Sequence, residues 1–379
     1  MNRKILITRR EEEDILALFE DTALVEIIAD TRGDGLCASG NIYLGRVQRY
    51  DKSLDSLFVE IGGKKAGILP MPKFVQQYDI PRQGEPILVQ VAREGFGTKG
   101  ARLTRSVTLP GRYVVLTPSE ARAKVSHKIT DEEVRRRLLS LADKEKPQDA
   151  GWILRSGCAN ASDNDITESA RQTLALWKRI QARAETLKPP CLLFKQDSPA
   201  MIAARDLSDG LTESVVDNAE VYAECADAFR LFAKELLPTV RLDESDAFIA
   251  NGIDIEETLK TRVPLVGGSN ILIEECETLT AIDVNSGASH ADSGNILKVN
   301  LLAAREAARQ LRLRDIGGVI MIDFIDMDSD EDRQKVTDEF KLASASDRSK
   351  IIVDGFTKRG LLELARKTLV RPVREVLRR

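Results

Sequence analysis

The stretch "GGVIMIDFIDMD", residues 317–328, has the length and apolar content of a β-strand, and acidic residues gather at its end. Asp323 lies inside the apolar run, on the strand face that also carries Met321 and Ile325. A carboxylate on a buried face is costly to desolvate unless a partner neutralises it. The stretch therefore predicts a strand whose Asp323 has a charged partner elsewhere in the fold.

The neighbouring sequence suggests that partner. Residues 277–287 form a second predicted strand that ends in Asp283 and Asn285, and residues 295–315 form a long predicted helix between the two strands. A right-handed crossover joins parallel strands, so both carboxyl ends emerge at the same edge of the sheet. Asp283 and Asp323 are therefore expected to converge. Two carboxylates with oxygen-rich neighbours suit a hard cation such as Mg²⁺.

Basic residues lie close in sequence to this edge, among them Arg312 and Lys358. Carboxylates, a divalent metal and basic side chains together favour phosphodiester hydrolysis. Two alternatives stay open. An Asp at a strand end is often only a turn former or helix cap. The Asp-x-Asp pattern from Asp326 resembles the start of a haloacid-dehalogenase-type phosphatase, although that class needs a longer downstream cap and core than the residues that follow here.

Composition sets the broad class. The chain has 379 residues, of which 42% are hydrophobic and 31% charged, with a net charge of -4. This length is enough for about two to four compact modules. The five cysteines are scattered and never form C-x-x-C, which argues against disulfides and zinc and for a reducing cytoplasm. The N-terminus has no apolar signal core, and no apolar run reaches the about 18 residues of a membrane span.

Residues 40–70 and 85–104 alternate polar and apolar positions between Gly-rich turns, which predicts a small antiparallel barrel. The alternative is a plain β-sandwich without a ligand. Its basic, Gly-rich loop includes Lys99 and suits single-stranded nucleic acid. Helices are predicted for residues 131–145 and 165–187, and residues 197–258 are expected to be rich in helix.

Two shorter segments complete the pattern. In "ILRSG", residues 153–157, Arg155 and Ser156 lie where a predicted strand meets a turn. An arginine fork, a hydroxyl and a following glycine amide could hold one terminal phosphate, while the alternative is a surface arginine in a turn. Residues 350–367, "KIIVDGFTKRGLLELARK", predict a strand, a turn and a helix.

Long motifs carry a resemblance to a known family. "TAIDVNSG" (280–287) followed by "ARQLRLRDIGGVIMIDFIDM" (308–327) resembles the catalytic segment of the RNase E/G family of bacterial endoribonucleases. Residues 40–70 resemble that family's S1 RNA-binding module, "ILRSG" its sensor of the RNA 5′ phosphate, and "RGLLELARK" (359–367) the segment after the catalytic strands. The resemblance covers essentially the whole chain, in the family's order.

The resemblance implies roles for individual residues. Asp283 and Asp323 match the family's Mg²⁺ ligands, and Asn285 matches the amide that positions the scissile phosphate and the attacking water. Arg155 matches the arginine that grips the 5′ monophosphate, and Ser156 stands where the best-known members have Thr.

The same resemblance extends to the RNA-binding module. Phe58 and Lys99 match residues implicated in holding RNA on the S1 module, while a second aromatic position of that module is Ile68 here. This replacement weakens the expected base stacking.

The implied fold is a multidomain α+β or α/β chain. Its expected parts are an RNase H-like subdomain split over 1–38 and 197–258, an S1 domain with an OB fold at 39–108, a 5′-sensor region at 109–196, and a DNase I-like catalytic subdomain at 259–379. Family members usually continue into a zinc-binding C-P-x-C link that joins protomers, and longer members add an acidic scaffold tail. The sequence ends at Arg379 without those cysteines, so no zinc is expected and the state of oligomerisation stays open.

The sequence thus predicts a cytoplasmic, Mg²⁺-dependent, single-strand-specific endoribonuclease in which Mn²⁺ is a possible substitute. Its expected substrates are rRNA precursors and mRNA, cut to leave 5′-phosphate and 3′-hydroxyl ends. The alternatives are an RNA-binding protein with reduced or lost catalysis and, more remotely, the phosphatase.

Overall fold

The computed structural model describes residues 2–31, 37–71, 80–95, 100–145, 150–287, 293–370 and 372–377. The chain forms two compact units. Unit 1 comprises residues 1–30, 210–222 and 241–379, and unit 2 comprises residues 31–209 and 223–240. Within the described ranges, no helix has both the length and the apolar composition needed to cross a bilayer.

The first sheet of unit 1 joins the strands at the N-terminus of the chain to two strands from residues 211–242. It contains β1 (Arg3–Arg10), β2 (Glu13–Glu20), β3 (Ala23–Thr31), β14 (Leu211–Val216) and β15 (Val240–Leu242), in the order β15-β14-β1-β2-β3. β14 pairs in parallel with β1. The segment expected to be rich in helix, residues 197–258, contains α3 (Pro199–Asp206) of unit 2, α4 (Ala219–Phe232), which spans the boundary between the two units in sequence, and α5 (Ala247–Ala250) and α6 (Ile255–Thr258) of unit 1.

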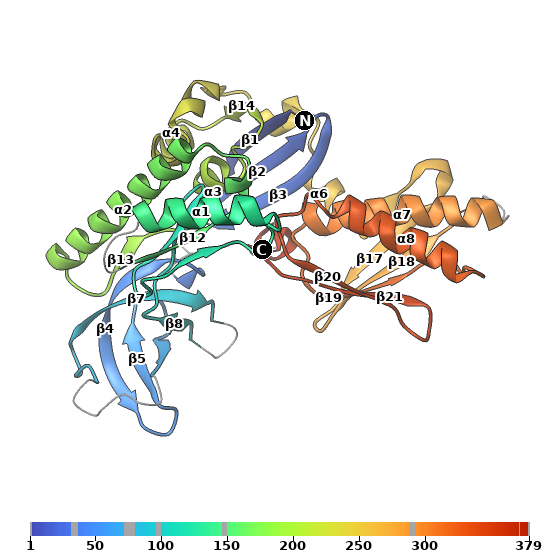
Figure 1. Cartoon of the computed structure of the whole chain (residues 1–379). Coiled ribbons are helices and arrows are strands. Elements are labelled where there is room, and N and C mark those ends of the chain that lie inside the picture. The colour runs from blue at the N-terminus through green and yellow to red at the C-terminus, as the bar shows by residue number, and fades with distance from the viewer. Residues whose placement is uncertain are drawn as a thin grey trace. The chain divides into compact units, whose positions relative to one another are not determined.

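Unit 2 contains the predicted barrel, whose strands β4 to β8 are drawn from light blue to teal in Figure 1. Strands β4 (Ile42–Asp51), β5 (Ser56–Glu60), β6 (Gly67–Pro70), β8 (Arg102–Thr104) and β7 (Pro86–Arg93) follow one another, and β7 pairs back with β4. The five strands therefore close on themselves, as in an OB fold. Apolar side chains such as Tyr43, Val59 and Val89 fill the interior. β13 (Cys191–Phe194) joins the barrel by pairing with β4.

A second, smaller sheet of unit 2 carries the expected sensor segment. Its order is β11-β12-β10-β9, formed by β11 (Ala123–Val125), β12 (Gly151–Leu154), β10 (Val114–Thr117) and β9 (Leu109–Pro110). The predicted helices are confirmed as α1 (Glu132–Glu145) and α2 (Asp163–Thr186). A 3₁₀ turn, Ser156–Ala159, follows β12 directly after Arg155.

The second sheet of unit 1 contains both acidic segments from which the catalytic site was predicted. Its order is β16-β17-β18-β19-β21-β20, with β16 (Arg262–Pro264), β17 (Asn270–Glu275), β18 (Thr280–Asn285), β19 (Gly318–Asp323), β20 (Ile351–Phe356) and β21 (Leu361–Arg366). Helices α7 (Ser293–Leu313) and α8 (Asp330–Ala343) lie together on one face of this sheet (Figure 1). The core between sheet and helices includes Ile282, Ile322, Ala304 and Phe340.

The helix predicted for the segment "LLELARK" is wrong, because residues 361–366 form strand β21. The segment consists mostly of good helix formers. β21 nevertheless pairs antiparallel with β19 on one side and β20 on the other. Leu362 and Leu364 alternate with less buried positions and reach the core at 0% exposure. Sheet pairing on both sides has overridden the local preference.

Candidate active site

Asp283 and Asp323 are direct neighbours on adjacent parallel strands. β18 and β19 pair in parallel, and the register places Asp283 opposite Asp323. The convergence predicted from the strand–helix–strand unit is therefore confirmed. Since side chains of residues that face each other across parallel strands point to the same side of a sheet, both carboxylates lie on one face.

That face is open, which corrects the expectation that Asp323 lies on a buried face. The side chains at Ile320 and Ile322 point into the helix-covered core with 0% exposure. Asp283 and Asp323 are exposed, and Val319 on the same face is 43% exposed. The run is apolar because the face with Ile320 and Ile322 packs under α7 and α8. The face with Asp323 was wrongly expected to be covered as well.

The electrostatics of the pair match a cation-binding site. Partial burial, followed by the neighbouring charges of Asp283 and Asp326, raises the pKa of Asp323. Like charges that crowd one another in this way are relieved by a bound cation. Among the described residues no group of three or more His, Cys, Asp or Glu side chains could hold a metal. Two carboxylates fit Mg²⁺, which commonly takes one or two protein carboxylates and keeps several waters.

Asn285 and Lys358 lie at the same end of the sheet. Asn285 Nδ2 donates a 2.8 Å hydrogen bond to Asp283 Oδ2, so the amide orients one carboxylate of the pair. The turn between β20 and β21 carries the exposed Lys358, and the next strand begins with Leu361 opposite Asp323. The turn that carries Lys358 therefore lies at the same end of the sheet as the acidic pair, where a cationic side chain can interact with a phosphate bound at the pair.

Arg312 does not fit the RNA contact expected for it. Its side chain is buried, at 5% exposure, and its Nη groups donate to Glu20 at 3.0 and 3.1 Å. A further contact joins Arg312 Nε to Glu26 at 3.4 Å. Two buried carboxylates thus neutralise Arg312, which ties helix α7 to β2 and β3 and leaves the guanidinium out of reach of a surface ligand.

The barrel presents a second candidate surface, formed in strand register by Arg49, Phe58, Ile68 and Arg102. Arg49 lies opposite Phe58, Phe58 opposite Ile68, and Ile68 opposite Arg102. The Arg49 guanidinium stacks over the Phe58 ring at 4.0 Å from its centroid. Arg49 and Arg102 are exposed. Arg102 belongs to the basic, Gly-rich segment that the sequence already associates with single-stranded nucleic acid, whereas Arg49 was missed, since only strand register places it beside Phe58. Lys99 lies outside the described residues.

Arg155 and Ser156 are adjacent at the end of β12, as predicted. The Arg155 side chain is 32% exposed and Ser156 is exposed. Arg155 Nη1 donates to the carbonyl oxygens of Gly111 at 2.8 Å and Arg112 at 3.3 Å, which fixes one side of the guanidinium. The pair can therefore offer an oriented guanidinium and a hydroxyl to one anion.

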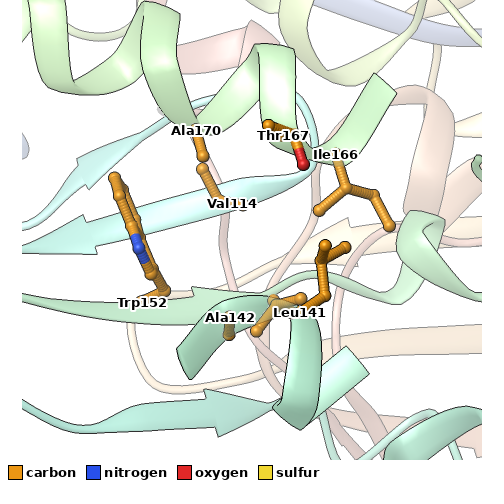
Figure 2. Close-up of a pocket in the computed structure, with 8 residues that line it drawn as sticks. Val114, Leu141, Ala142, Trp152, Ile166, Thr167 and Ala170 are labelled. Atoms are coloured by element: carbon orange, nitrogen blue, oxygen red, sulfur yellow. The ribbon is translucent and has the colours of Figure 1, made fainter. Parts of the chain in front are cut away.

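A small pocket nearby has different chemistry. Figure 2 shows it between strands β10 and β12 and helices α1 and α2. The residues that line it are Val114, Leu141, Ala142, Trp152, Leu154, Ile166, Thr167 and Ala170. None of these side chains is charged, so the pocket belongs to the apolar packing between this small sheet and helices α1 and α2 and is not a phosphate site.

Comparison with known proteins assigns the family. A family model described as the ribonuclease E/G family matches residues 108–369, which is more than half of the chain. The chain belongs to the ribonuclease E/G family. It is 31% identical to ribonuclease G of Haemophilus influenzae over 99% of this chain and 81% of that protein. It is 32% identical to ribonuclease G of Escherichia coli over 89% of this chain and 74% of that protein.

Ribonuclease E/G relatives of greater length are matched only in part. The chain is 34% identical to ribonuclease E of a Nostoc species over 97% of its own length but 56% of that protein. The ribonuclease E/G model covers the acidic pair and Arg155, whereas Phe58 of the barrel precedes the matched range. The family assignment leaves the phosphatase alternative without support.

Proposed function

We propose that this chain is a Mg²⁺-dependent endoribonuclease that cuts single-stranded RNA to 5′-phosphate and 3′-hydroxyl ends. The observation that carries the proposal is the in-register pair Asp283 and Asp323 on the open face of the sheet. Membership of the ribonuclease E/G family supports RNA as the substrate.

The two carboxylates would hold the metal. Mg²⁺, when bound, polarises a phosphoryl oxygen and promotes the ionisation of water, and Mn²⁺ has the ligand preferences to replace it. Asn285 keeps the Asp283 carboxylate in one orientation through its 2.8 Å hydrogen bond. Lys358 would offset the charge of the scissile phosphate from the neighbouring turn.

The rest of the chain would bind and select RNA. The barrel surface of Arg49, Phe58, Ile68 and Arg102 combines an aromatic ring with exposed cations, which suits stacked bases and phosphates of a single strand. Arg155 and Ser156 would grip a 5′ monophosphate. We place the activity in the cytoplasm, on rRNA precursors and mRNA, and assign the barrel as an S1 domain between the parts of an RNase H-like subdomain, with a DNase I-like catalytic subdomain after it.

The test is cleavage of a short single-stranded RNA labelled at its 3′ end. The RNA is supplied with a 5′ monophosphate or a 5′ hydroxyl, each with Mg²⁺ or with EDTA. We expect internal cuts only with Mg²⁺, and faster cuts on the monophosphate. Cuts that persist in EDTA would exclude the metal assignment. Equal rates on the two RNAs would keep the nuclease and reject the role of Arg155. Binding without cleavage would indicate an RNA-binding protein.

A further inference from the structure

Arg155 belongs to a chain of alternating charges that runs from the surface into unit 2. Arg155 Nη2 donates to Asp206 Oδ1 at 2.6 Å. The other oxygen, Asp206 Oδ2, accepts from Arg205 Nη2 at 2.6 Å and from Arg205 Nε at 3.1 Å. Arg205 Nη2 also donates to Asp197 Oδ1 at 2.7 Å. We name the four residues Arg155, Asp206, Arg205 and Asp197 the sensor ladder.

The ladder is anchored in buried structure. The side chains of Asp206 and Arg205 are each 6% exposed, whereas that of Arg155 is 32% exposed. Burial by itself lowers the pKa of Arg205, but the charges and hydrogen bonds of Asp206 and Asp197 outweigh it and raise the pKa. Arg205 therefore stays charged and holds the Asp206 carboxylate in place, with its second oxygen aimed at Arg155.

The contacts of Arg155 leave some of its N–H donors without an acceptor among the described residues. An arginine has five N–H donors. The Gly111 and Arg112 carbonyl groups occupy Nη1, and Asp206 occupies one hydrogen of Nη2. No described residue accepts from Nε or from the second hydrogen of Nη2. The Arg155 guanidinium therefore keeps donors, Nε–H among them, that can hydrogen-bond to the oxygens of a phosphate.

We infer that Asp206 is a positioning residue for recognition of a terminal phosphate monoester, holding Arg155 so that its remaining donors face the ligand. The inference rests on the proposed function, in which Arg155 binds the RNA 5′ phosphate. Asp206 fixes a long side chain that is otherwise free to rotate, and so lowers the entropy lost when the phosphate binds. A carboxylate is needed because each of its two oxygens serves a different arginine.

The substitution Asp206→Asn separates positioning from simple electrostatics, because the two effects have opposite signs. Asn removes a negative charge beside the phosphate, and charge alone would then strengthen binding. Asn also has one acceptor oxygen in place of two, so either Arg155 or Arg205 loses its partner. We expect the rate advantage of 5′-monophosphate RNA over 5′-hydroxyl RNA to fall about 3- to 10-fold, mainly through KM, with the 5′-hydroxyl rate unchanged.

Asp209→Asn is the matched control. Asp209 is a nearby carboxylate of unit 2 that contacts Arg112 at 3.2 Å and is 62% exposed. Its removal takes away one negative charge from the same segment without touching the ladder contacts that orient Arg155. We expect the monophosphate advantage of this variant to stay the same or rise. If Asp209→Asn lowers the advantage as much as Asp206→Asn does, the specific role of Asp206 is wrong.

Asp197→Asn tests the positioning role if Asp206→Asn fails to fold. Asp197 is 29% exposed and acts one step further from Arg155, so the same loss is expected at a smaller size. The wild-type protein separates the two proposals. A wild-type enzyme that does not cut RNA, or cuts both RNAs equally, refutes the proposed function or its sensor. A wild-type preference that Asp206→Asn leaves unchanged or increases, with Asp197→Asn likewise inert, refutes only the positioning role.

Discussion

Asp283 and Asp323 repel each other on an open sheet face, so the pair is expected to contribute to metal binding without stabilising the fold. Replacing either residue by Asn removes a ligand from the proposed metal site and should reduce cleavage by about 100-fold or more. The thermal midpoint measured without Mg²⁺ should stay the same or rise slightly, because partial burial and the charge of Asp283 raise the pKa of Asp323.

The measurement pairs RNA cleavage with thermal unfolding in EDTA. Added Mg²⁺ should raise the midpoint of the wild-type protein, and should do so much less for Asp323→Asn. A variant that cuts RNA at the wild-type rate in ordinary Mg²⁺ would remove the pair from the active site. A variant that unfolds at a much lower temperature would show that the carboxylate has a structural role instead.

Phe58 and Ile68 allow the barrel surface to be tested in both directions. Phe58→Ala should weaken binding of a short single-stranded RNA about tenfold, because base–aromatic stacking contributes about 1–3 kcal/mol per base. Ile68→Phe should tighten binding several-fold, since Ile68 lies opposite Phe58 and would extend the aromatic surface. Neither change should alter the dependence of affinity on salt.

Arg102→Gln is the contrasting variant for that surface. It removes an exposed cation beside Ile68, so the slope of log affinity against log salt should fall by about 1. Affinity is measured by fluorescence anisotropy over a range of salt concentrations. If Phe58→Ala and Ile68→Phe both leave affinity unchanged while the protein still binds RNA, the RNA binds elsewhere on the molecule.

Strand β21 provides the prediction at the scale of secondary-structure elements. Leu364→Ala should lower the free energy of unfolding by about 2–5 kcal/mol, because Leu364 is 0% exposed in the core under the helices. Leu342→Ala is the matched control, since Leu342 on α8 is 71% exposed and its loss should change stability by less than about 0.5 kcal/mol. Urea unfolding compares the two. Equal effects would mean that residues 361–366 do not pack as this strand.

At the scale of secondary-structure elements, the sequence predicts helices best where the apolar repeat continues over many residues. Helices α1, α2, α7 and α8 extend over many turns with a clear apolar stripe, and their existence could be predicted. Strands β14, β15 and β16 are short, and their places depend on pairing with distant segments. The parallel neighbours Asp283 and Asp323 followed from a crossover rule, but the open face did not, because no local pattern shows which side α7 and α8 cover.

At the scale of the whole molecule, buried charge joins parts of unit 1 that are remote in sequence. Arg312 on α7 bonds to Glu20 on β2, a separation of 292 residues. Arg348 adds a contact with Glu26 on β3. The candidate site thus rests on a sheet whose covering helix is fixed to the N-terminal strands. Nothing in the local sequence indicates such a pairing, which is why Arg312 was wrongly predicted to contact RNA. The pairing of Asp206 with Arg155 was missed for the same reason.

The buried network gives a pH dependence of stability. Burial alone raises the pKa of Glu20, but hydrogen bonds and charge from Arg312 and Arg3 outweigh it and lower the pKa below its ordinary value. A depressed pKa stabilises the fold above the unfolded-state pKa, and this stabilisation is lost as the pH falls through the folded-state pKa. Glu20→Gln should therefore be clearly less stable than wild type at pH 7.

The difference between the two proteins should shrink as the pH falls, because protonated Glu20 and Gln are both neutral. The measurement is the free energy of unfolding in urea for wild type and Glu20→Gln from pH 7 down to the lowest pH at which both fold. A difference that stays constant across this range would contradict the pairing of ionised Glu20 with Arg312.

The register of β18 against β19 has a consequence for how the protein can change over time. The separation of Asp283 and Asp323 is set by backbone pairing, at the about 4.8 Å that divides neighbouring strands, and owes little to the shapes of the core side chains. Substitutions among the apolar core residues beneath the sheet can therefore alter stability while the two carboxylates keep their spacing. A one-residue deletion within β19 would do the reverse, since it would turn Asp323 toward the helices. The geometry of the acidic pair is therefore robust to substitution in the core but sensitive to insertions and deletions in β19.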